Sequence, residues 1–360
     1  MGPMAAKRAG PAGVEAALST VLLLCFLLPG CGDGREVSEW EFETMGTVGA
    51  LRIYHADPAL AEGGMRSVTA VFDSVRSVMS TWDPDSEISG LNRAPAGRPV
   101  LLSPWLDDCL SRAEEIRAAS GGAFDPTAEP LMRLWGFYRR EGRLPSEAEM
   151  DSARALMGDY THDRGAGMIV KGNPNTSFDL GGIAKGYALD RAGEVLIKLG
   201  IKDALIDLGG NLLCMGAPPG RERWRVGIRD PREKERLFAW VETAGGAVAT
   251  SGSYERYVVI DGRRYGHIMN PATGRPAEGL LSVTVLASGA TTADGLSTAL
   301  FVMGLERGRG LLRDSFPDVE SVFVAAPDGS EPPRITASRG LEGRFTLPPE
   351  IEDEYVVEFR

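Results

Sequence analysis

The chain has 360 residues, 43% hydrophobic and 25% charged, which is enough for a sizeable core in one large or two ordinary domains. This composition excludes an intrinsically disordered protein. The formal net charge of −11 argues against nucleic acid as a partner, because nucleic acid is itself a polyanion.

Residues 1–30 read as a targeting segment that is separate from the fold. Lys7 and Arg8 precede an apolar stretch at residues 16–28, which is shorter than a membrane span. The sequence Leu-Pro-Gly-Cys ending at Cys31 resembles a bacterial lipobox, so we expect cleavage before Cys31 and a lipid on its thiol. A plain signal peptide or a short membrane anchor is the alternative. In each case the globular part lies outside the cytoplasm, after a polar tether at residues 31–39.

The cysteines indicate no disulfide framework. Cys25 leaves with the leader and Cys31 is the proposed lipid site, so Cys109 and Cys214 remain, without the spacing of a zinc site. The two could form one bridge, but buried thiols are the preferred interpretation.

Folded structure is expected from Trp40 onward, with two strands around a turn at residues 45–47. A helix should follow, because apolar residues recur at helical spacing from residue 68 to Trp82, and Asp83-Pro84 ends it. Trp82 fits either the core or a platform for a ligand ring.

Ser103 and Pro104 predict the start of a second helix, and Gly121-Gly122 its end. The next segment, residues 122–130, contains two prolines and therefore presents its side chains from a loop. Residues 139–165 are charged and indicate a surface helix and loop.

The segment at residues 178–190 reads as a strand end, a Gly-Gly turn and the start of a helix that ends at Gly200. Such a turn leaves backbone N–H groups free to face a phosphate or pyrophosphate, and Lys185 lies in the first helical turn. The alternative is a corner whose glycines only permit close packing.

Strands dominate the second half, with candidates at residues 204–208, 224–228, 241–250, 257–261 and 281–286. The loop at residues 265–276 holds His267, one of three histidines. A histidine in a polar loop is a candidate for proton transfer, although a lone histidine is more often structural.

The segment at residues 290–304 is expected to be a helix. It places Asp294, Ser297 and Thr298 on one face at i, i+3 and i+4. One carboxylate with two hydroxyls is an oxygen-only set that suits Mg²⁺ bound with water and substrate phosphates. The alternative is an aspartate that caps the helix or faces solvent.

Taken together, the motifs resemble the ApbE family of bacterial lipoproteins, the FAD:protein FMN transferases. The blocks that carry this resemblance lie at residues 44–47, 80–82, 122–127, 179–188, 251–257, 267–276 and 293–300. Two positions depart from the family pattern: Gly295 replaces a residue that is commonly Ala, and Asn270 stands where many members have Asp.

The resemblance implies one α+β domain at residues 40–345, related to the T-fold, with mixed and antiparallel sheets and packed helices, followed by a tail at residues 346–360. It further implies FAD as substrate and Mg²⁺ as cofactor. By the family pattern, the residues in contact with FAD would be Met45, Trp82, Ala123, Phe124, Asp125, Asp179, Lys185 and Ile268. The metal would be held by the Gly182 backbone with Asp294, Ser297 and Thr298.

The implied reaction transfers FMN from FAD to a Thr or Ser hydroxyl of an acceptor protein and releases AMP. His267, Lys185 and Asp294 are the predicted catalytic residues. Expected acceptors carry a Ser/Thr-Gly-Ala-Thr pattern and include subunits of membrane redox complexes. The expected location is a lipid anchor at the periplasmic face of the inner membrane. Two alternatives stay open: a Mg²⁺-dependent FAD pyrophosphatase that gives FMN and AMP, and a lipoprotein that only carries FAD.

Overall fold

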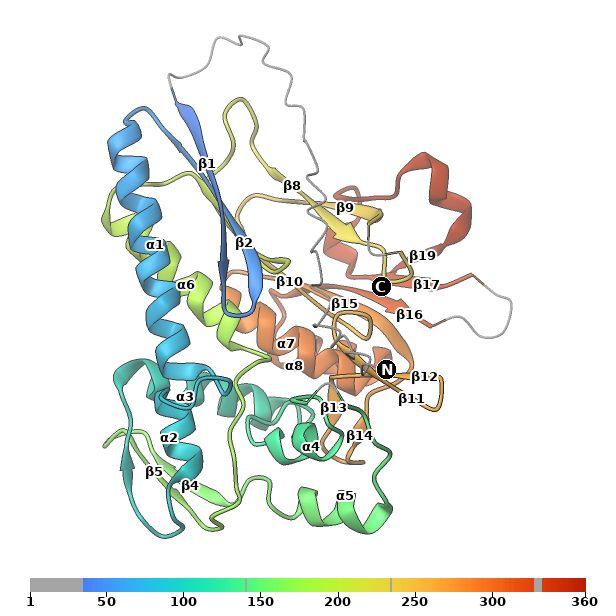
Figure 1. Ribbon diagram of the computed structural model, residues 1–360. Coiled ribbons are helices and arrows are strands. Elements are labelled where there is room, and N and C mark those ends of the chain that lie inside the picture. Colours follow the sequence, from blue (N-terminus) through green and yellow to red (C-terminus); the bar gives the residue numbers. More distant parts are fainter. Residues whose placement is uncertain (1–34, 140, 234, 327–331) are drawn as a thin grey trace, which may run out of the picture. The chain divides into compact units, whose positions relative to one another are not determined.

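The computed structural model of the protein describes residues 35–139, 141–233, 235–326 and 332–360 (Figure 1). The predicted signal peptide, Cys31 and the first part of the predicted tether lie outside these residues. None of the helices in the described ranges is long and apolar enough to cross a membrane. Cys109 and Cys214 are buried free thiols, as the sequence predicted.

A nine-stranded sheet forms the centre of the fold. In spatial order its strands are β1 (Glu36–Thr44), β2 (Thr47–His55), β6 (Ala204–Leu208), β7 (Asn211–Met215), β10 (Gly246–Gly252), β15 (Leu280–Ala287), β16 (Glu320–Ala325), β17 (Arg334–Ala337) and β19 (Val356–Phe359). Only the pairing of β17 with β19 is parallel among these strands. The predicted α+β class with mixed and antiparallel sheets is therefore confirmed.

Four helices cover one face of this sheet, namely α1, α6, α7 and α8 (Figure 1). The helices of the described residues are α1 (Pro58–Met79), α2 (Glu87–Arg93), α3 (Pro104–Ala119), α4 (Glu129–Leu134), α5 (Glu147–Arg154), α6 (Ala184–Lys198), α7 (Ala290–Met303) and α8 (Leu305–Ser315), with short 3₁₀ turns η1 (Arg339–Leu341) and η2 (Pro349–Glu354). Helix α3 begins and ends as its caps predict. Helix α1 starts ten residues before the predicted apolar stripe, because Asp57 caps it and Pro58 occupies its first turn.

The other face of the nine-stranded sheet is covered by a second core. Along β10, Ala247 and Ala249 pack with the helices, whereas Val248 between them packs with Phe238 and Val241 of β9. This alternation follows from the two-residue period of a strand, and it gives the fold three layers. The smaller sheets are β18 (Phe345–Thr346) with β9 (Leu237–Thr243) and β8 (Trp224–Arg229); β3 (Val100–Leu101) with β5 (Met168–Lys171) and β4 (Tyr160–Asp163); β11 (Tyr257–Ile260) with β12 (Arg263–Gly266); and β13 (Met269–Asn270) with β14 (Arg275–Pro276).

Four boundaries differ from the sequence predictions. The strand expected at residues 241–250 is two strands, β9 and β10, because Gly245 and Gly246 turn the chain with positive φ angles of 141° and 86°. The strand end expected at Phe178 is an irregular segment. The tail expected after residue 345 is part of the fold, since β19 pairs with β17, and the first strand starts at Glu36 rather than at Trp40.

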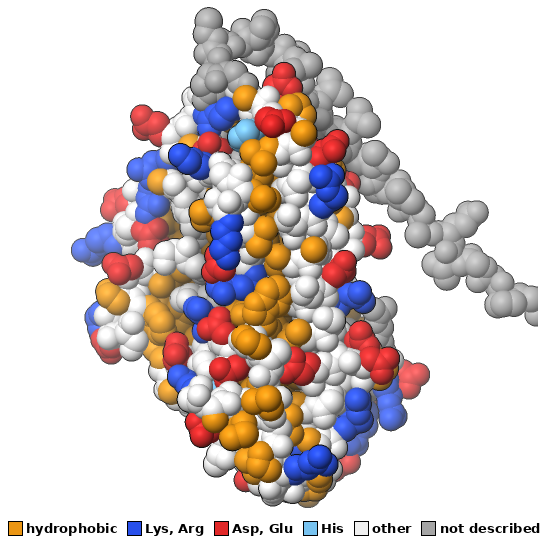
Figure 2. Space-filling model, turned by 90° about the vertical axis from the view of Figure 1, so that its left-hand side faces the viewer, with side chains coloured by type: hydrophobic (Ala, Val, Ile, Leu, Met, Phe, Trp, Pro, Cys, Tyr) orange, Lys and Arg blue, Asp and Glu red, His pale blue; other side chains and the backbone are white. Residues whose placement is uncertain are grey.

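One face of the molecule carries charges of both signs. Figure 2 shows the side that lies to the left in Figure 1, where Lys and Arg side chains alternate with Asp and Glu around a narrow hydrophobic band. This face therefore presents no continuous field of one sign.

Candidate active site

The first turn of α6 lies against the first half of α7. Asp294 is 3% exposed and accepts a hydrogen bond from the Gly186 amide at 2.8 Å. Its other carboxylate oxygen lies 3.5 Å from Nζ of Lys185. A Cβ atom at position 186 would lie 2.7 Å from Cβ of Asp294, so the helices approach this closely only because residue 186 is glycine. The fold thus brings together Lys185 and Asp294, two of the predicted catalytic residues.

Three hydroxyl groups gather where α7 meets the end of β10. Oγ of Ser251 lies 2.8 Å from Oγ of Ser297 and 3.3 Å from Oγ1 of Thr298. Ser297 is fully buried and also donates to the main-chain carbonyl of Asp294 at 2.8 Å. A Cβ atom at position 182 would lie 3.2 Å from Oγ1 of Thr298, which places Gly182 next to that hydroxyl. Thr298 is half-buried whereas Ser297 is fully buried, so the Thr298 hydroxyl oxygen is the more accessible of the two to a metal.

Asp294, Thr298 and the backbone at Gly182 form a set of oxygen donors. Within the described ranges, no three His, Cys, Asp or Glu side chains are grouped closely enough to hold a metal ion by themselves. A cation here would need hydroxyl, backbone, water and substrate oxygens in addition to the one carboxylate. Mg²⁺ accepts this mixture, since it commonly keeps water and substrate phosphate ligands. The residues present therefore fit a hard divalent cation.

The Gly-Gly turn before α6 offers fewer free N–H groups than the sequence predicted. The Gly181 amide donates to Oδ1 of Asp179 at 2.7 Å, and the Ile183 and Ala184 amides donate to the Leu180 carbonyl at 3.0 and 2.8 Å. With Gly186 bound to Asp294, the amides of Gly182 and Lys185 are those of residues 181–186 without a partner among the described residues. Two amides and the Lys185 ammonium remain to face an anion.

His267 lies in the loop between β12 and β13, where its protonation is well defined. Its Nδ1 lies 3.1 Å from the carbonyl oxygen of Arg256. A carbonyl oxygen only accepts, so Nδ1 carries the proton and Nε2 keeps its lone pair. Burial, with the positive charges of Arg256 and Lys185, lowers the pKa of His267 to about 4. The imidazole is therefore neutral near pH 7 and has a free acceptor, as a general base requires.

Trp82 lies on the surface and is not a core residue. Its side chain is 59% exposed, and its ring is tilted against that of Tyr138 with centroids 5.1 Å apart. Tyr138 in turn donates its hydroxyl to Oδ2 of Asp179, and burial followed by the Asp179 charge raises the pKa of that hydroxyl. The core interpretation of Trp82 is therefore wrong, and the ligand platform stays a prediction. Tyr138 connects the Trp82 ring to the Gly-Gly turn.

The predicted FAD loop at residues 122–130 also reaches the Gly-Gly turn. A Cβ atom at Gly182 would lie 3.1 Å from the Phe124 ring, and the Asp179 amide donates to the Pro126 carbonyl at 2.8 Å. Ala123, Phe124 and Ile268 are buried, at 8%, 4% and 7% exposure. Their side chains can shape the site, but a ligand would meet their backbone more readily.

Asp125 has a structural partner that its sequence context did not indicate. Its side chain is 5% exposed, with Oδ2 at 2.7 Å from Nε of Arg117 on α3. Its Oδ1 accepts from the Thr127 amide at 2.8 Å and from the Thr127 hydroxyl. Both carboxylate oxygens are thus engaged in the protein, and Asp125 orders the loop rather than offering a free carboxylate.

Met45 lies in the hairpin turn between β1 and β2. Its φ is +49° and that of Gly46 is +71°, a pair of left-handed residues that suits a two-residue hairpin loop. Met45 also packs against the helix-side core. The tight turn therefore fixes where this predicted FAD contact lies.

A buried lysine holds the segment that leads into the Gly-Gly turn. Lys171 is 1% exposed, and its Nζ donates to the carbonyls of Asn92, Pro174 and Thr176 at 2.7, 2.9 and 3.1 Å. The Asn92 side chain binds both the amide and the carbonyl of Phe178, at 2.7 and 2.9 Å. Lys171 and Asn92 together replace the backbone pairing that the expected strand would have provided.

The comparisons with known proteins point in one direction. A model of the ApbE family matches residues 45–323, which is most of the chain. A curated FAD:protein FMN transferase of Treponema pallidum is 33% identical over 362 residues, covering 94% of this chain and 97% of the relative. One from Vibrio cholerae serotype O1 is 34% identical, covering 81% and 88%. The chain belongs to the ApbE family.

Solved structures of ApbE proteins share the fold. The flavin transferase ApbE from Vibrio cholerae matches with a TM-score of 0.76 at 29% identity, covering 86% of this chain and 99% of that one. The apo form of the Pseudomonas stutzeri flavinyl transferase ApbE also gives 0.76, at 32% identity, covering 86% and 97%. The ApbE fold therefore extends over nearly the whole of the described chain.

The two departures from the ApbE pattern have local explanations. A Cβ atom at Gly295 would lie 2.3 Å from Cδ1 of Ile116, so α3 packs into the space that an alanine would fill. Asn270 accepts from the Ala272 amide at 3.0 Å and so closes the turn between β13 and β14, a task that an aspartate performs equally well. Neither departure removes a donor from the ApbE site described above.

Sequence reasoning missed four residues of this ApbE site: Tyr138, Ser251, Lys171 and Asn92. Ser251 lies in one of the family blocks, so its place beside α7 could have been proposed. The other three gave no signal. A lysine such as Lys171 in a short strand is normally exposed, and Tyr138 precedes a charged segment that is typical of the surface. Asn92 has no sequence feature that indicates its partner.

Proposed function

We propose that the protein transfers FMN from FAD to a Thr or Ser hydroxyl of an acceptor protein and releases AMP, in a reaction that depends on Mg²⁺. The observation that carries this proposal is the contact of Asp294 on α7 with Lys185 and the Gly186 amide in the first turn of α6, beside the Thr298 hydroxyl. Membership of the ApbE family supports it, because the curated relatives carry the name FAD:protein FMN transferase.

Asp294, Thr298 and the backbone of Gly182 would hold the metal, with Ser251, itself held by Ser297, orienting the Thr298 hydroxyl. A bound Mg²⁺ would neutralise charge on the pyrophosphate and on the leaving AMP. Lys185 adds a positive charge at the same place, and the amides of Gly182 and Lys185 can donate to phosphate oxygens. This side of the site therefore stabilises the departing phosphate.

The flavin half of FAD would lie over Trp82, whose ring is exposed and supported by Tyr138. Met45, the loop at residues 123–125, Asp179 and Ile268 would complete the contacts with FAD. The loop is held by the Arg117–Asp125 pair, so this part of the site is formed before FAD arrives. Preorganisation of this kind lowers the ordering cost of binding.

His267 would act as the base. The acceptor hydroxyl oxygen attacks the phosphorus of the FMN half, its proton passes to Nε2 of His267, and the bond to the AMP oxygen breaks with its electron pair. The hydrogen bond of Nδ1 to Arg256 holds the required tautomer. Asp294 and Lys185 stabilise the charge that develops on AMP.

The acceptor would be another protein. The chain has a matching segment of its own, Ser-Gly-Ala-Thr at residues 288–291. However, Thr291 is 1% exposed, and its hydroxyl donates to Oδ2 of Asp190 at 2.5 Å. Self-modification at Thr291 is therefore not part of the proposal. We propose acceptors with this pattern at the membrane surface, where a lipid on Cys31 would place the enzyme.

The test compares wild type with Asp294→Asn, which keeps the size of the side chain and removes its charge. Both are incubated with FAD, Mg²⁺ and an acceptor bearing the threonine motif, and covalent flavin is read by fluorescence on a denaturing gel. Loss of metal-borne stabilisation costs several kcal/mol, so labelling should fall by at least about a hundredfold. Asp318→Asn, an exposed change in the loop before β16, should label normally.

The same assay separates the alternatives. Rapid release of free FMN and AMP by wild type, with no labelled acceptor, would make the protein an FAD pyrophosphatase. Bound FAD with neither reaction in the presence of Mg²⁺ would make it a carrier.

A further inference from the structure

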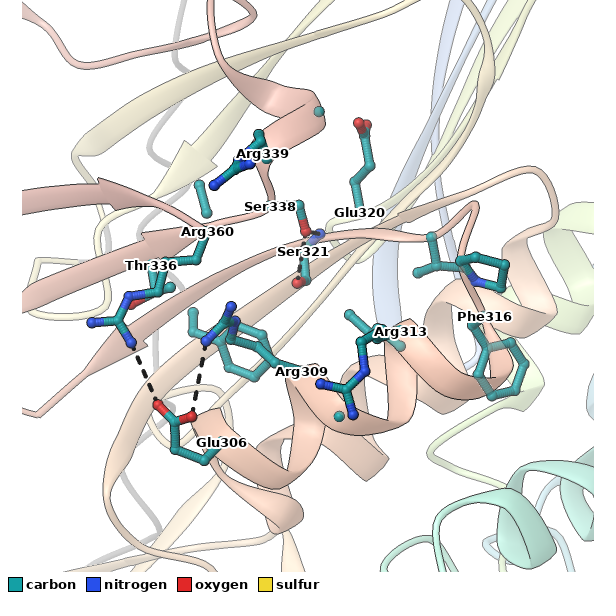
Figure 3. Close-up of a pocket in the computed structure, with 17 residues that line it drawn as sticks. Glu306, Arg309, Arg313, Phe316, Glu320, Ser321, Thr336, Ser338, Arg339 and Arg360 are labelled. Carbon is teal, nitrogen blue, oxygen red and sulfur yellow. Dashed lines mark hydrogen bonds and ion pairs between the residues drawn. The ribbon is translucent and has the colours of Figure 1, made fainter.

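A pocket outside the candidate active site lies between α8, β16, β17 and η1 (Figure 3). Its volume is about 440 Å³, which is within the range of small-molecule sites. None of its lining residues belongs to the candidate active site. The reaction proposed above leaves this pocket without a role.

The pocket is lined by four arginines and two glutamates. Arg309 and Arg313 come from α8, Arg339 from η1, and Arg360 follows β19. Such a concentration of guanidinium groups is unexpected in a chain with a net charge of −11. It indicates a site for an anion.

Two of these cations, Arg309 and Arg339, have no close ion pair among the described residues. Arg309 lies 3.9 Å from the exposed Glu306, a distance at which a surface ion pair contributes little. Arg360 lies 3.6 Å from Glu306 and 2.9 Å from Glu358, and Arg313 lies 2.8 Å from Asp314, so these two arginines are already paired. Arg339 has no side-chain hydrogen bond or ion pair to any residue that the structure describes.

The other glutamate does not oppose an anion. Glu320 is held by Arg344, whose Nη2 lies 2.6 Å from Oε2 and also contacts Oε1. Arg344 is not among the lining residues, so it neutralises Glu320 from outside the pocket.

Ser321 and Ser338 line the pocket, and one of their two hydroxyl protons is not used between them. Oγ of Ser338 accepts from the Ser321 amide at 2.8 Å and lies 3.2 Å from Oγ of Ser321. Only one of the two hydroxyl protons can lie between the oxygens, so the other is free for a ligand. Ser321 is 2% exposed, and a buried hydroxyl proton without an acceptor is destabilising. A ligand oxygen that accepts this proton would therefore be stabilised.

We propose that this pocket binds the phosphate group of a small phosphate monoester. Figure 3 shows Arg309 and Arg313 on one side of the two serines and Arg339 on the other. Donors on opposite sides suit a tetrahedral phosphate with three free oxygens, whereas a planar carboxylate is satisfied by one bidentate arginine. The apolar wall of Phe316 and Phe323 would contact the organic part of the molecule.

The test is calorimetric titration of the full chain with glycerol 3-phosphate, in the presence of FAD so that the active site is occupied. Wild type should bind one equivalent, and raising the salt concentration should weaken binding. Arg339→Gln should bind at least about tenfold more weakly while FMN transfer stays unchanged. Arg98→Gln, which removes an exposed arginine far from the pocket lining, is the matched control and should bind as wild type does.

Other outcomes overturn the proposal. Absence of saturable binding in wild type, or equal binding of succinate and glycerol 3-phosphate, excludes a phosphate site. If Thr298→Ala weakens binding and Arg339→Gln does not, the probe is entering the active site. Circular dichroism of Arg339→Gln should match that of wild type, so that a loss of binding can be told from a loss of structure.

Discussion

Trp82 and His267 show how a residue's role depends on what the fold places around it. Spacing put Trp82 on the apolar face of a helix, yet α1 ends at Met79 and Trp82 follows in an exposed turn. The sequence could not assign the tautomer of His267, because the Arg256 carbonyl that selects it lies across a hairpin. Both residues therefore acquire a defined chemistry only from their neighbours.

Trp82→Ala should weaken FAD binding by about 1–3 kcal/mol, the order found for aromatic stacking on bases. The protein should stay folded, because the ring is 59% exposed and supports no core. Fluorescence titration gives the affinity and thermal unfolding the stability. Leu101→Ala, which removes an even more exposed hydrophobic side chain from β3, is the control. Unfolding without a selective loss of affinity would show that Trp82 stabilises the fold and not the bound FAD.

The pKa of His267 predicts the pH dependence of transfer. Since its pKa is lowered to about 4, the base stays unprotonated down to that pH, and kcat/KM should fall only below about pH 4–5. His267→Gln should lower kcat/KM by about 10²–10⁴-fold at pH 7. A fall of wild-type activity centred near pH 6.5 would contradict the prediction.

The lowered pKa of His267 also affects the free energy of unfolding. Between pH 6.5 and about 4 the unfolded chain binds a proton at His267 that the folded chain does not, so stability falls as the pH is lowered through this window. His267→Gln should remove that contribution, which urea unfolding at pH 7 and pH 5 would measure.

At the scale of elements, the site depends on contacts between helices and loops that are distant in sequence. Helix α7 has no side-chain cap of its own; instead Asp190 of α6 accepts from the Ala290 and Thr291 amides at 2.7 and 2.9 Å. Together with the Gly186–Asp294 contact, this fixes α6 and α7 at two points. The irregular segment before α6 is held by Lys171.

Lys171→Met should destabilise the protein by about 2–5 kcal/mol, because three backbone carbonyls lose a charged donor in a buried place. It should also weaken FAD binding, since residues 174–178 lead into the Gly-Gly turn. Urea unfolding and FAD titration measure the two effects. Lys198→Met, in the exposed last turn of α6, should change neither. Normal stability of Lys171→Met would show that the segment is held by Asn92 alone.

At the scale of the whole molecule, the nine-stranded sheet brings together site residues from segments that are spread over nearly the full length of the domain. The contributing segments run from the β1–β2 turn to α7, and the C-terminal strand β19 closes the sheet on β17. Removal of residues 346–360 would therefore expose the β17 edge and is not a neutral truncation.

The location of the enzyme is predicted from its leader alone. Cys31→Ser should release the protein from membranes into a soluble extracytoplasmic fraction, because the lipid would be lost. FAD binding and transfer to a soluble acceptor should be unchanged, since the described domain starts after this residue. Fractionation with detection of the protein measures the effect. Cys109→Ser is the matched control for a cysteine change. Continued membrane retention of Cys31→Ser would count against lipidation.

The sequence by itself determined the features that depend on neighbours within a turn or two. The helical period placed Asp294 and Thr298 on one face of α7, and caps placed both ends of α3. The family blocks identified the class of enzyme. These signals are local or are matched to a known pattern, so they needed no tertiary contacts.

Only the tertiary structure decided which of these groups are free to act. The Asp125 carboxylate holds Arg117, Trp82 is left exposed, and Ser251 of β10 lies against the Ser297 hydroxyl of α7. The physical reason is that a carboxylate, hydroxyl or ring is available only when no other group satisfies or covers it. That depends on which strands and loops the sheet order places side by side, and residues such as Arg117 and Asp125 carry no sign of their partner in sequence.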